Sequence, residues 1–521
     1  MKTVSDRASR PVVRTAAGAV RGTWEPCSPG AAEGPSAAVF RGIPYAAAPV
    51  GALRFAPPQP CEAWDGIRDA SAFGPTPQRG DTGITLIPEH SIPGDDTLNV
   101  NVWTPAPEAS AKLPVIVWIH GGGFISGSPA SPWYDGRAFA RDGVVLVTIS
   151  YRLGFIGFGS VDGAPANRGV LDWVRSLEWV QQNIAGFGGD PDRVTIAGQS
   201  AGGGAVLTLL GVPATEGLFA AGYAMSAAVA APSLDAAAAR TRHLARLGGV
   251  TPDLAGLGSL PEATIIELQR RITAPAAPRI LRDVHGMLRD GLMIGPLPDG
   301  DVVPLDALQG TSHGPSAHVP LALSTADDEL MGMFTPRPIL DRAPRRAVLR
   351  ALGASAAVAD RWLETPEVQA TASSVALVGR YATDAVFRSW VPRVARARGA
   401  SAVAGTTWTS RYSWHAPDTE AGAPHFAGHC SDVPFVFARL DAVGVERVAG
   451  TAPPQALADA VHGALVRFAR DGDPGWESDR DGTGPARIFD VPVREQRDAY
   501  ASAAALLEAS HSRDASAHPS R

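Results

Sequence analysis

Three short runs of almost unbroken apolar residues constrain the fold of this chain most strongly. They lie at residues 115–120, 144–150 and 194–197 and are rich in Val and Ile. Strands that are buried on both faces show such continuous rather than alternating hydrophobicity. Residues 167–185, between the second and third runs, repeat their apolar side chains at the spacing of one helix face. This alternation predicts an α/β fold, with a mostly parallel central sheet and helices on both of its faces.

The rest of the chain is expected to extend this arrangement. Later strand candidates lie at residues 222–226, 319–323 and 408–414. Two Ala- and Arg-rich stretches, near 231–300 and 331–400, have helical patterns interrupted by Pro and Gly, and we expect helical insertions over one end of the sheet there. Because no linker-like stretch divides the chain, we predict a single domain over residues 1–511 and a disordered tail at 512–521.

Composition excludes several classes of function. The chain has 46 basic and 52 acidic residues, a net charge of −6, and no basic block of the kind that binds nucleic acid. Its three cysteines, Cys27, Cys61 and Cys430, suggest neither a disulfide framework nor a zinc site. We recognise no signal peptide and no apolar run long enough to span a membrane. We therefore expect a cytoplasmic protein without a metal or other cofactor.

The pattern Gly-x-Ser-x-Gly occurs twice, and the surroundings separate the two occurrences. Ser200 follows the strand candidate at 193–198 and precedes a helix-like segment at 201–210. A sharp turn between a strand and a helix exposes a serine hydroxyl at the edge of a sheet, which makes Ser200 the candidate nucleophile. Ser312 lies in a Pro-flanked segment that we predict to be a loop without a following helix, so we assign it no such role.

A glycine triplet directly follows the first strand candidate. Consecutive glycines can aim several backbone N–H groups into one cavity, where they stabilise the negative charge that forms when a serine attacks a carbonyl. The expected donors are Gly122, Gly123 and, after the nucleophile, Ala201. A flexible loop is the alternative for the triplet alone, but its position after a buried strand favours the functional interpretation.

These motifs together resemble the type-B carboxylesterases, a family with bacterial para-nitrobenzyl esterases, animal carboxylesterases and cholinesterases. The resemblance rests on Gly-Gly-Gly-Phe, Gly-x-Ser-Ala-Gly-Gly and Phe-Gly-Gly-Asp-Pro, and it runs from about residue 12 to about residue 490. It implies the α/β-hydrolase fold. It also implies a serine hydrolase that acts through an acyl-enzyme intermediate on small to medium uncharged esters.

The resemblance also indicates the acid of a catalytic triad. The family's acid follows a strand in a Gly-Thr-x-x-x-Glu pattern, and residues 319–329 align with it. This alignment places the acid at Glu329. Asp327 and Asp328 are close competitors, and the residues by themselves do not choose among the three.

The base of the triad is indicated in the same way. The family's histidine precedes an acid–Pro–Phe–Val–Phe run, which matches residues 429–437 and identifies His429; His425, four residues earlier, is the alternative. In this arrangement a neutral His429 would take the proton of Ser200, and Glu329 would stabilise the resulting imidazolium.

The chain departs from the family at Gln199, at Thr76 and Thr97, and at residues 225–228, where Met-Ser-Ala-Ala replaces a Gln-Ser-Gly-type segment. Gln199 stands where the family usually has glutamate, so one carboxylate near the triad is missing. Thr76 and Thr97 replace the cysteines of an early disulfide, which agrees with an intracellular location.

The substrate pocket is less clear from the sequence. Phe124 is the first candidate for its wall, with Trp133 and Tyr134 as further candidates, whereas core packing is expected for Trp414. Ser226 could form a hydrogen bond behind the triad or could simply be a buried serine at the end of a strand.

Two other functions remain open at this stage. The same triad would serve a carbamate or amide hydrolase, which no motif distinguishes from an esterase. Some family members have lost the catalytic serine and are binding modules, but the complete triad in this chain disfavours that role.

Overall fold

The computed structural model describes residues 9–28, 34–80, 86–230, 232–273, 285–286, 288, 291–333, 343–371, 373–417 and 426–507. Within these ranges, the main sheet is formed by β3 (Thr23–Pro26), β4 (Ser36–Pro44), β6 (Asn99–Thr104), β7 (Leu113–Ile119), β8 (Val145–Ile149), β9 (Gly189–Gln199), β10 (Ala221–Met225), β11 (Leu321–Ala326), β12 (Thr407–Tyr412), β13 (Ala486–Phe489) and β14 (Arg494–Gln496). A smaller sheet contains β1 (Val12–Arg14), β2 (Ala19–Arg21) and β5 (Ile67–Asp69).

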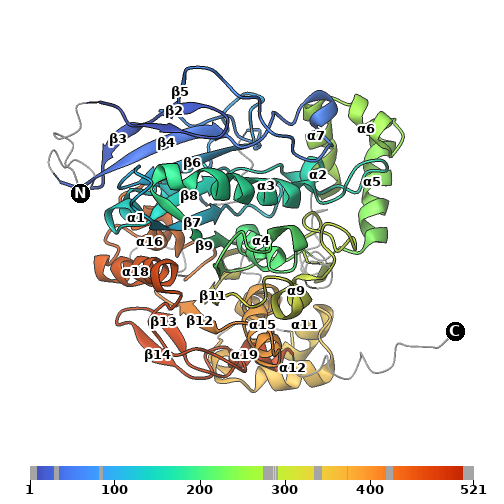
Figure 1. Ribbon diagram of the computed structural model, residues 1–521. Coiled ribbons are helices and arrows are strands. Elements are labelled where there is room, and N and C mark those ends of the chain that lie inside the picture. Colours follow the sequence, from blue (N-terminus) through green and yellow to red (C-terminus); the bar gives the residue numbers. More distant parts are fainter. Residues whose placement is uncertain are drawn as a thin grey trace.

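The main sheet is mostly parallel, which confirms the predicted α/β class. Its 11 strands have the order β14-β13-β12-β11-β10-β9-β7-β8-β6-β4-β3 in the described part of the chain. The pairs from β8 across to β13 are parallel, and antiparallel pairs lie only at the two edges. In Figure 1 the strands follow one another from β3 and β4 at the top to β13 and β14 at the bottom.

Both faces of the sheet are covered by helices. The larger ones are α3 (Arg168–Asn183), α4 (Ala201–Leu209) and α18 (Gln455–Asp471), and the shorter ones include α1 (Arg137–Arg141), α2 (Gly154–Phe158), α16 (Val433–Val436), α17 (Glu446–Ala449) and α19 (Ala501–Ala505). In β7, Val115, Val117 and Ile119 pack in the core that contains α3 and α4, whereas Ile116 and Trp118 pack in the core that contains α18. The continuous apolar run of β7 is thus explained by burial on both faces.

Two groups of helices lie in the stretches expected to be insertions. One contains α5 (Leu234–Gly248), α6 (Leu254–Ser259) and α7 (Glu262–Thr273), and the other contains α11 (Arg345–Ala351), α12 (Ala356–Leu363), α13 (Pro366–Gln369), α14 (Ser374–Thr383), a π-helical turn η7 (Asp384–Arg388) and α15 (Trp390–Gly399). Each group builds an apolar cluster separate from the central cores. The single-domain organisation stays a prediction, and the predicted tail at 512–521 lies outside the described residues.

One local expectation is wrong. Ser312 does not lie in a loop but near the end of the helix α9 (Ala307–His313), with its side chain buried. Asp306 caps this helix by accepting a hydrogen bond from the backbone N–H of Gln309 at 2.9 Å. This capping signal precedes the Gly-x-Ser-x-Gly match and is what the sequence interpretation overlooked. Across the portion of the chain that is described, no helix combines the length and apolar character needed to cross a membrane.

Candidate active site

The turn between β9 and α4 holds Ser200 in a strained backbone conformation. Its φ and ψ are 60° and −123°, a region that residues with a side chain rarely adopt. Three backbone hydrogen bonds of 2.9 Å fix the turn: Ser200 N–H donates to Met225 O, and Ser200 O accepts from Gly204 N–H and Ala228 N–H. The surrounding structure therefore maintains the strain and presents the hydroxyl at the carboxyl end of β9.

The glycines on either side of this turn are required by close packing. A Cβ on Gly202 would lie 1.9 Å from Ile119 O, and a Cβ on Gly198 would lie 2.5 Å from the backbone of Gly202. Real Cβ atoms essentially never approach this closely. The first turn of α4 consequently packs directly against the end of β7, which brings Ser200 beside the glycine triplet.

The structure brings Ser200, His429 and Glu329 together in one chain of hydrogen bonds. Ser200 Oγ lies 2.9 Å from His429 Nε2, and His429 Nδ1 lies 2.5 Å from Glu329 Oε2. The other carboxylate oxygen, Glu329 Oε1, accepts a hydrogen bond of 2.8 Å from Ala326 N–H. The Glu329 side chain is fully buried, so its orientation is fixed by these two contacts.

The environment of His429 favours its charged form. Burial by itself lowers the pKa of the imidazole, but Cys430 and the Glu329 carboxylate raise it, and the resulting pKa lies well above that of an ordinary histidine. An imidazole beside a buried carboxylate accepts a proton readily because the imidazolium is stabilised.

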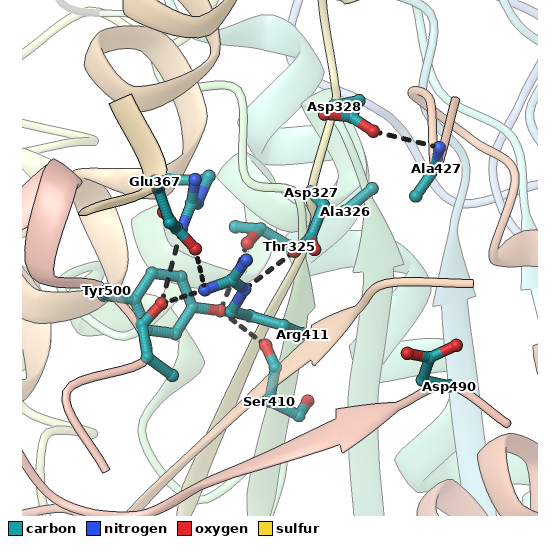
Figure 2. A network of polar contacts seen from close by, with 12 residues as sticks. Thr325, Ala326, Asp327, Asp328, Glu367, Ser410, Arg411, Ala427, Asp490 and Tyr500 are labelled. Carbon is teal, nitrogen blue, oxygen red and sulfur yellow. Dashed lines mark hydrogen bonds and ion pairs between the residues drawn. The ribbon is translucent and has the colours of Figure 1, made fainter. Parts of the chain in front are cut away.

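The two acids that compete with Glu329 in the sequence point elsewhere. Asp327 Oδ1 pairs with Arg411 Nε at 2.7 Å, and Asp328 accepts hydrogen bonds from Arg380 and His415. Figure 2 shows Asp327 beside Arg411 and Asp328 beside Ala427. Of the three consecutive acids, only Glu329 contacts His429. The alternative base, His425, lies outside the described residues.

The glycine triplet forms a tight turn next to the nucleophile. Gly122 and Gly123 have φ angles of 105° and 61°, and a Cβ on Gly122 would lie 2.2 Å from Ser126 O. Gly122 O accepts hydrogen bonds from the N–H groups of Ile125 at 3.1 Å and Ser126 at 3.0 Å. In the part of the chain that the structure describes, the N–H groups of Gly122, Gly123 and Ala201 donate no hydrogen bond. This is compatible with the expected oxyanion hole, which stays a prediction.

Three further side chains surround the imidazole. Gln199 Nε2 lies 3.4 Å from His429 Nε2, and Cys430 Sγ donates to Gln199 Oε1 at 3.5 Å. The ring centroids of Phe387 and His429 are 4.7 Å apart. The sequence interpretation noted Gln199 only as a departure from the family and assigned no contact to Cys430 or Phe387. Gln199 is adjacent in sequence to Ser200, and Cys430 is adjacent to His429, so their positions could have suggested these contacts.

A further acid, Asp432, lies near this group and is almost completely buried. Burial, and then the charge of Glu329, raises the pKa of Asp432 to about 7. Neither of its carboxyl oxygens has a hydrogen-bond partner among the residues with described positions. A carboxyl group with this pKa is about half protonated near pH 7, so it carries less negative charge beside His429 than an ordinary aspartate would.

The aromatic residues expected to line a pocket are buried. Phe124 is inaccessible to solvent, with its ring centroid 5.3 Å from that of Phe158. Trp133 and Tyr134 belong to the core beside α18 instead of a pocket wall, and Trp414 packs in the same core as expected. Whether Phe124 contacts substrate stays a prediction.

Ser226 lies at the end of β10 and is also buried. Its N–H donates to Ser324 O at 2.7 Å, but its hydroxyl has no hydrogen-bond partner in the described ranges. The structure therefore favours the simpler alternative, a buried serine at the end of a strand. The described residues contain no group of three His, Cys, Asp or Glu side chains that could hold a metal ion, and all three cysteines are free.

Comparison with known proteins identifies the family. Residues 9–483 match the carboxylesterase family. The chain is 33% identical over 482 residues to para-nitrobenzyl esterase of Bacillus subtilis (strain 168), an alignment that covers 88% of this chain and 92% of the relative. It is 32% identical over 469 residues to fumonisin B1 esterase of Sphingopyxis macrogoltabida, with 85% and 81% of the two chains covered.

The three-dimensional comparison agrees with the sequence comparison. A solved structure of a PNB esterase superimposes with a TM-score of 0.81 at 29% identity, and the match covers 96% of this chain and 99% of that one. Family, fold and the strand–turn–helix at Ser200 all agree: this chain is a member of the carboxylesterase family with the α/β-hydrolase fold, and it is an ester hydrolase.

Proposed function

We propose that the chain hydrolyses small to medium uncharged carboxylic esters through a Ser200–His429–Glu329 triad. The observation that carries this proposal is the continuous hydrogen-bond chain from Glu329 through His429 to Ser200, with distances of 2.5 Å and 2.9 Å. A serine hydroxyl is a weak nucleophile at neutral pH, and an imidazole in this position removes its proton during attack.

In the first half of the reaction, Ser200 Oγ attacks the ester carbonyl carbon and His429 Nε2 accepts the hydroxyl proton. The carbonyl oxygen becomes an oxyanion that the free N–H groups of Gly122, Gly123 and Ala201 would bind. A single such donor is typically worth about 3 kcal/mol of transition-state stabilisation. His429 then returns the proton to the leaving alkoxide, which departs as the alcohol, and the acyl group stays on Ser200.

In the second half, water takes the place of the alcohol. His429 removes a proton from the water, the resulting hydroxide attacks the acyl-enzyme, and Ser200 leaves with the proton held by His429. Throughout both halves Glu329 accepts the Nδ1–H hydrogen bond and stabilises the imidazolium. The expected kinetics are ping-pong, with a burst of alcohol release wherever deacylation is the slower step.

The proposed preference for uncharged substrates rests on the residues around the imidazole. Gln199, Cys430 and Phe387 contact His429 or its immediate neighbour, and they contribute a neutral amide, a thiol and an aromatic ring. None of the three offers a counter-charge to an ionic ester. The names of the two curated relatives, a para-nitrobenzyl esterase and a fumonisin B1 esterase, support esters as the substrate class.

The test compares Ser200→Ala with Ser312→Ala in the purified protein, using p-nitrophenyl acetate as the probe. Ser312 is the matched control because it has the same local sequence pattern but lies buried in α9. We expect Ser200→Ala to lose nearly all hydrolysis and its burst while Ser312→Ala keeps both. Full activity in a folded Ser200→Ala protein would refute the triad. A panel of matched esters, amides and carbamates then tests whether esters are the preferred class.

A further inference from the structure

Asp327 and Asp328 directly precede Glu329 but have no part in the proposed triad. Both are largely buried, with side-chain exposures of 14% and 5%. Buried carboxylates are costly unless they are paired and hydrogen-bonded, so each of them needs a set of partners. The partners of Asp327 differ from those of Asp328. This difference indicates a structural role for Asp327 and a role in positioning the triad for Asp328.

Asp327 joins its loop to the neighbouring strand β12 and to the segment around Glu367. Its carboxylate pairs with Arg411 at 2.7 Å, and Arg411 in turn pairs with Glu367 at 2.7 Å. Thr325 Oγ1, Tyr500 Oη and Ser410 O continue this network, as Figure 2 shows. These partners belong to β11, β12 and to segments near residues 367 and 500, and none of them lies in the segment that carries His429.

Asp328 instead joins the segment that carries Glu329 to the segment that carries His429. Its N–H donates to Ala427 O at 2.9 Å, and its Oδ2 accepts from Ala427 N–H at 3.3 Å. Ala427 lies two residues before His429, and His429 N–H donates to Glu329 O at 3.3 Å. The two segments therefore run side by side, and the Asp328 side chain closes the contact between them (Figure 2).

Two side chains from other elements hold the Asp328 carboxylate in place. Arg380 of α14 donates to Oδ1 at 2.9 Å, and His415, just after β12, lies 2.7 Å from Oδ2 through its Nε2. Arg380 also donates to the backbone oxygen of Asp327 at 2.8 Å. The carboxylate that meets Ala427 is consequently fixed from two directions.

We propose that Asp328 is a positioning residue, whose carboxylate, held by Arg380 and His415, clamps the His429 segment against the Glu329 segment. This inference rests on the triad proposed above. The hydrogen bond between His429 and Glu329 and the one between Ser200 and His429 both depend on the position of the imidazole. A displacement of about 1 Å in such a group can cost about 100-fold in rate.

The test compares Asp328→Asn with Asp327→Asn as its matched control. Each variant removes one buried, ion-paired carboxylate from the same loop, so loss of charge and loss of stability are common to both. We expect Asp328→Asn to lower kcat by roughly 10- to 100-fold with little change in KM. The acid limb of its kcat/KM profile should also move to lower pH. The reason is that a displaced Glu329 stabilises the imidazolium less, which lowers the pKa of His429. Asp327→Asn should lower the melting temperature but leave kcat and the pH profile close to those of the parent.

Two results would overturn the proposal: equal effects of the two variants on kcat and pH profile, or a parent-like kcat in Asp328→Asn. Should Asp328→Asn fail to fold, Arg380→Lys and His415→Gln each weaken one contact to the carboxylate and leave Asp328 itself in place. An intermediate loss of kcat in both supports the clamp, and unchanged kcat in both contradicts it. Failure of the clamp is distinguishable from failure of the triad, because the latter requires an active Ser200→Ala protein.

Discussion

Replacing Glu329 by glutamine removes a single charge from the centre of the site and preserves the shape of the side chain. In the parent, Glu329 Oε2 lies 2.5 Å from His429 Nδ1 in a fully buried position. At an effective dielectric constant near 20, two unit charges whose centres are about 4 Å apart interact by about 4 kcal/mol. Loss of that interaction from the imidazolium-like transition state corresponds to a fall in kcat of about a thousandfold.

The amide adds a second effect. Glutamine can present an N–H group to Nδ1, which would place the imidazole proton on Nε2 and leave that atom unable to accept the proton of Ser200. Loss of the correct tautomer in a comparable triad costs about 10⁴-fold in kcat. We therefore expect Glu329→Gln to retain between about a thousandth and a ten-thousandth of the parental kcat.

The pH profile gives an independent reading of the same change. Cys430 and Glu329 raise the pKa of His429 above its ordinary value, and the base must be neutral to act. When the carboxylate is removed, the pKa of His429 falls and the neutral form persists to lower pH. The acid limb of kcat/KM should thus move to lower pH even though the rate itself is much reduced.

Steady-state and burst kinetics of p-nitrophenyl acetate hydrolysis measure both effects in purified protein. Glu329→Asp is the matched control for charge, since it keeps the carboxylate but withdraws it by one methylene, and its kcat should lie between those of the parent and Glu329→Gln. Asp327→Asn controls for removal of a neighbouring carboxylate. A Glu329→Gln protein with near-parental kcat would refute the reasoning, and a more severe effect of Asp327→Asn would transfer the role of the acid to Asp327.

Three further outcomes are expected. His429→Ala should lose hydrolysis while the far-ultraviolet circular dichroism stays unchanged, and an active, folded variant would exclude His429 as the base. Gln199→Glu places a carboxylate where the amide now lies 3.4 Å from His429 Nε2. The added negative charge should raise the pKa of His429 and move the acid limb of kcat/KM to higher pH. An acid limb at the parental pH would contradict this contact. Gly202→Ala adds a Cβ 1.9 Å from Ile119 O and should destabilise the fold by about 1–3 kcal/mol in denaturant unfolding, whereas parental stability would show that α4 can move away from β7.

Much of the fold could be predicted from local patterns. The continuous apolar runs indicated buried parallel strands because a strand covered on both faces must be apolar on both faces, and β7 divides its residues between two cores in this way. The glycines around Ser200 and the triplet at residues 121–123 were informative because close backbone approach and positive φ exclude larger side chains.

The local patterns failed where the outcome depended on distant contacts. Ser312 has the same Gly-x-Ser-x-Gly pattern as Ser200, but it lies inside a capped helix. Trp133 and Tyr134 were candidates for a pocket wall, yet they pack in the core beside α18. Aromatic residues suit both environments, and the sequence contains no signal that distinguishes a pocket wall from a core.

The sequence by itself determined the class of fold and narrowed the site to one serine, two histidines and three adjacent acids. The family resemblance favoured Glu329, but only the tertiary structure shows which acid contacts His429, because it determines the direction in which three consecutive side chains leave one loop. Arg411, 84 positions from Asp327, holds that carboxylate, and Arg380, 52 positions from Asp328, holds the next. Glu329 is left to meet His429, which is 100 positions away. Such pairings depend on how the sheet places its strands and on where opposite charges can be buried together, and neither is recorded in the local order of residues.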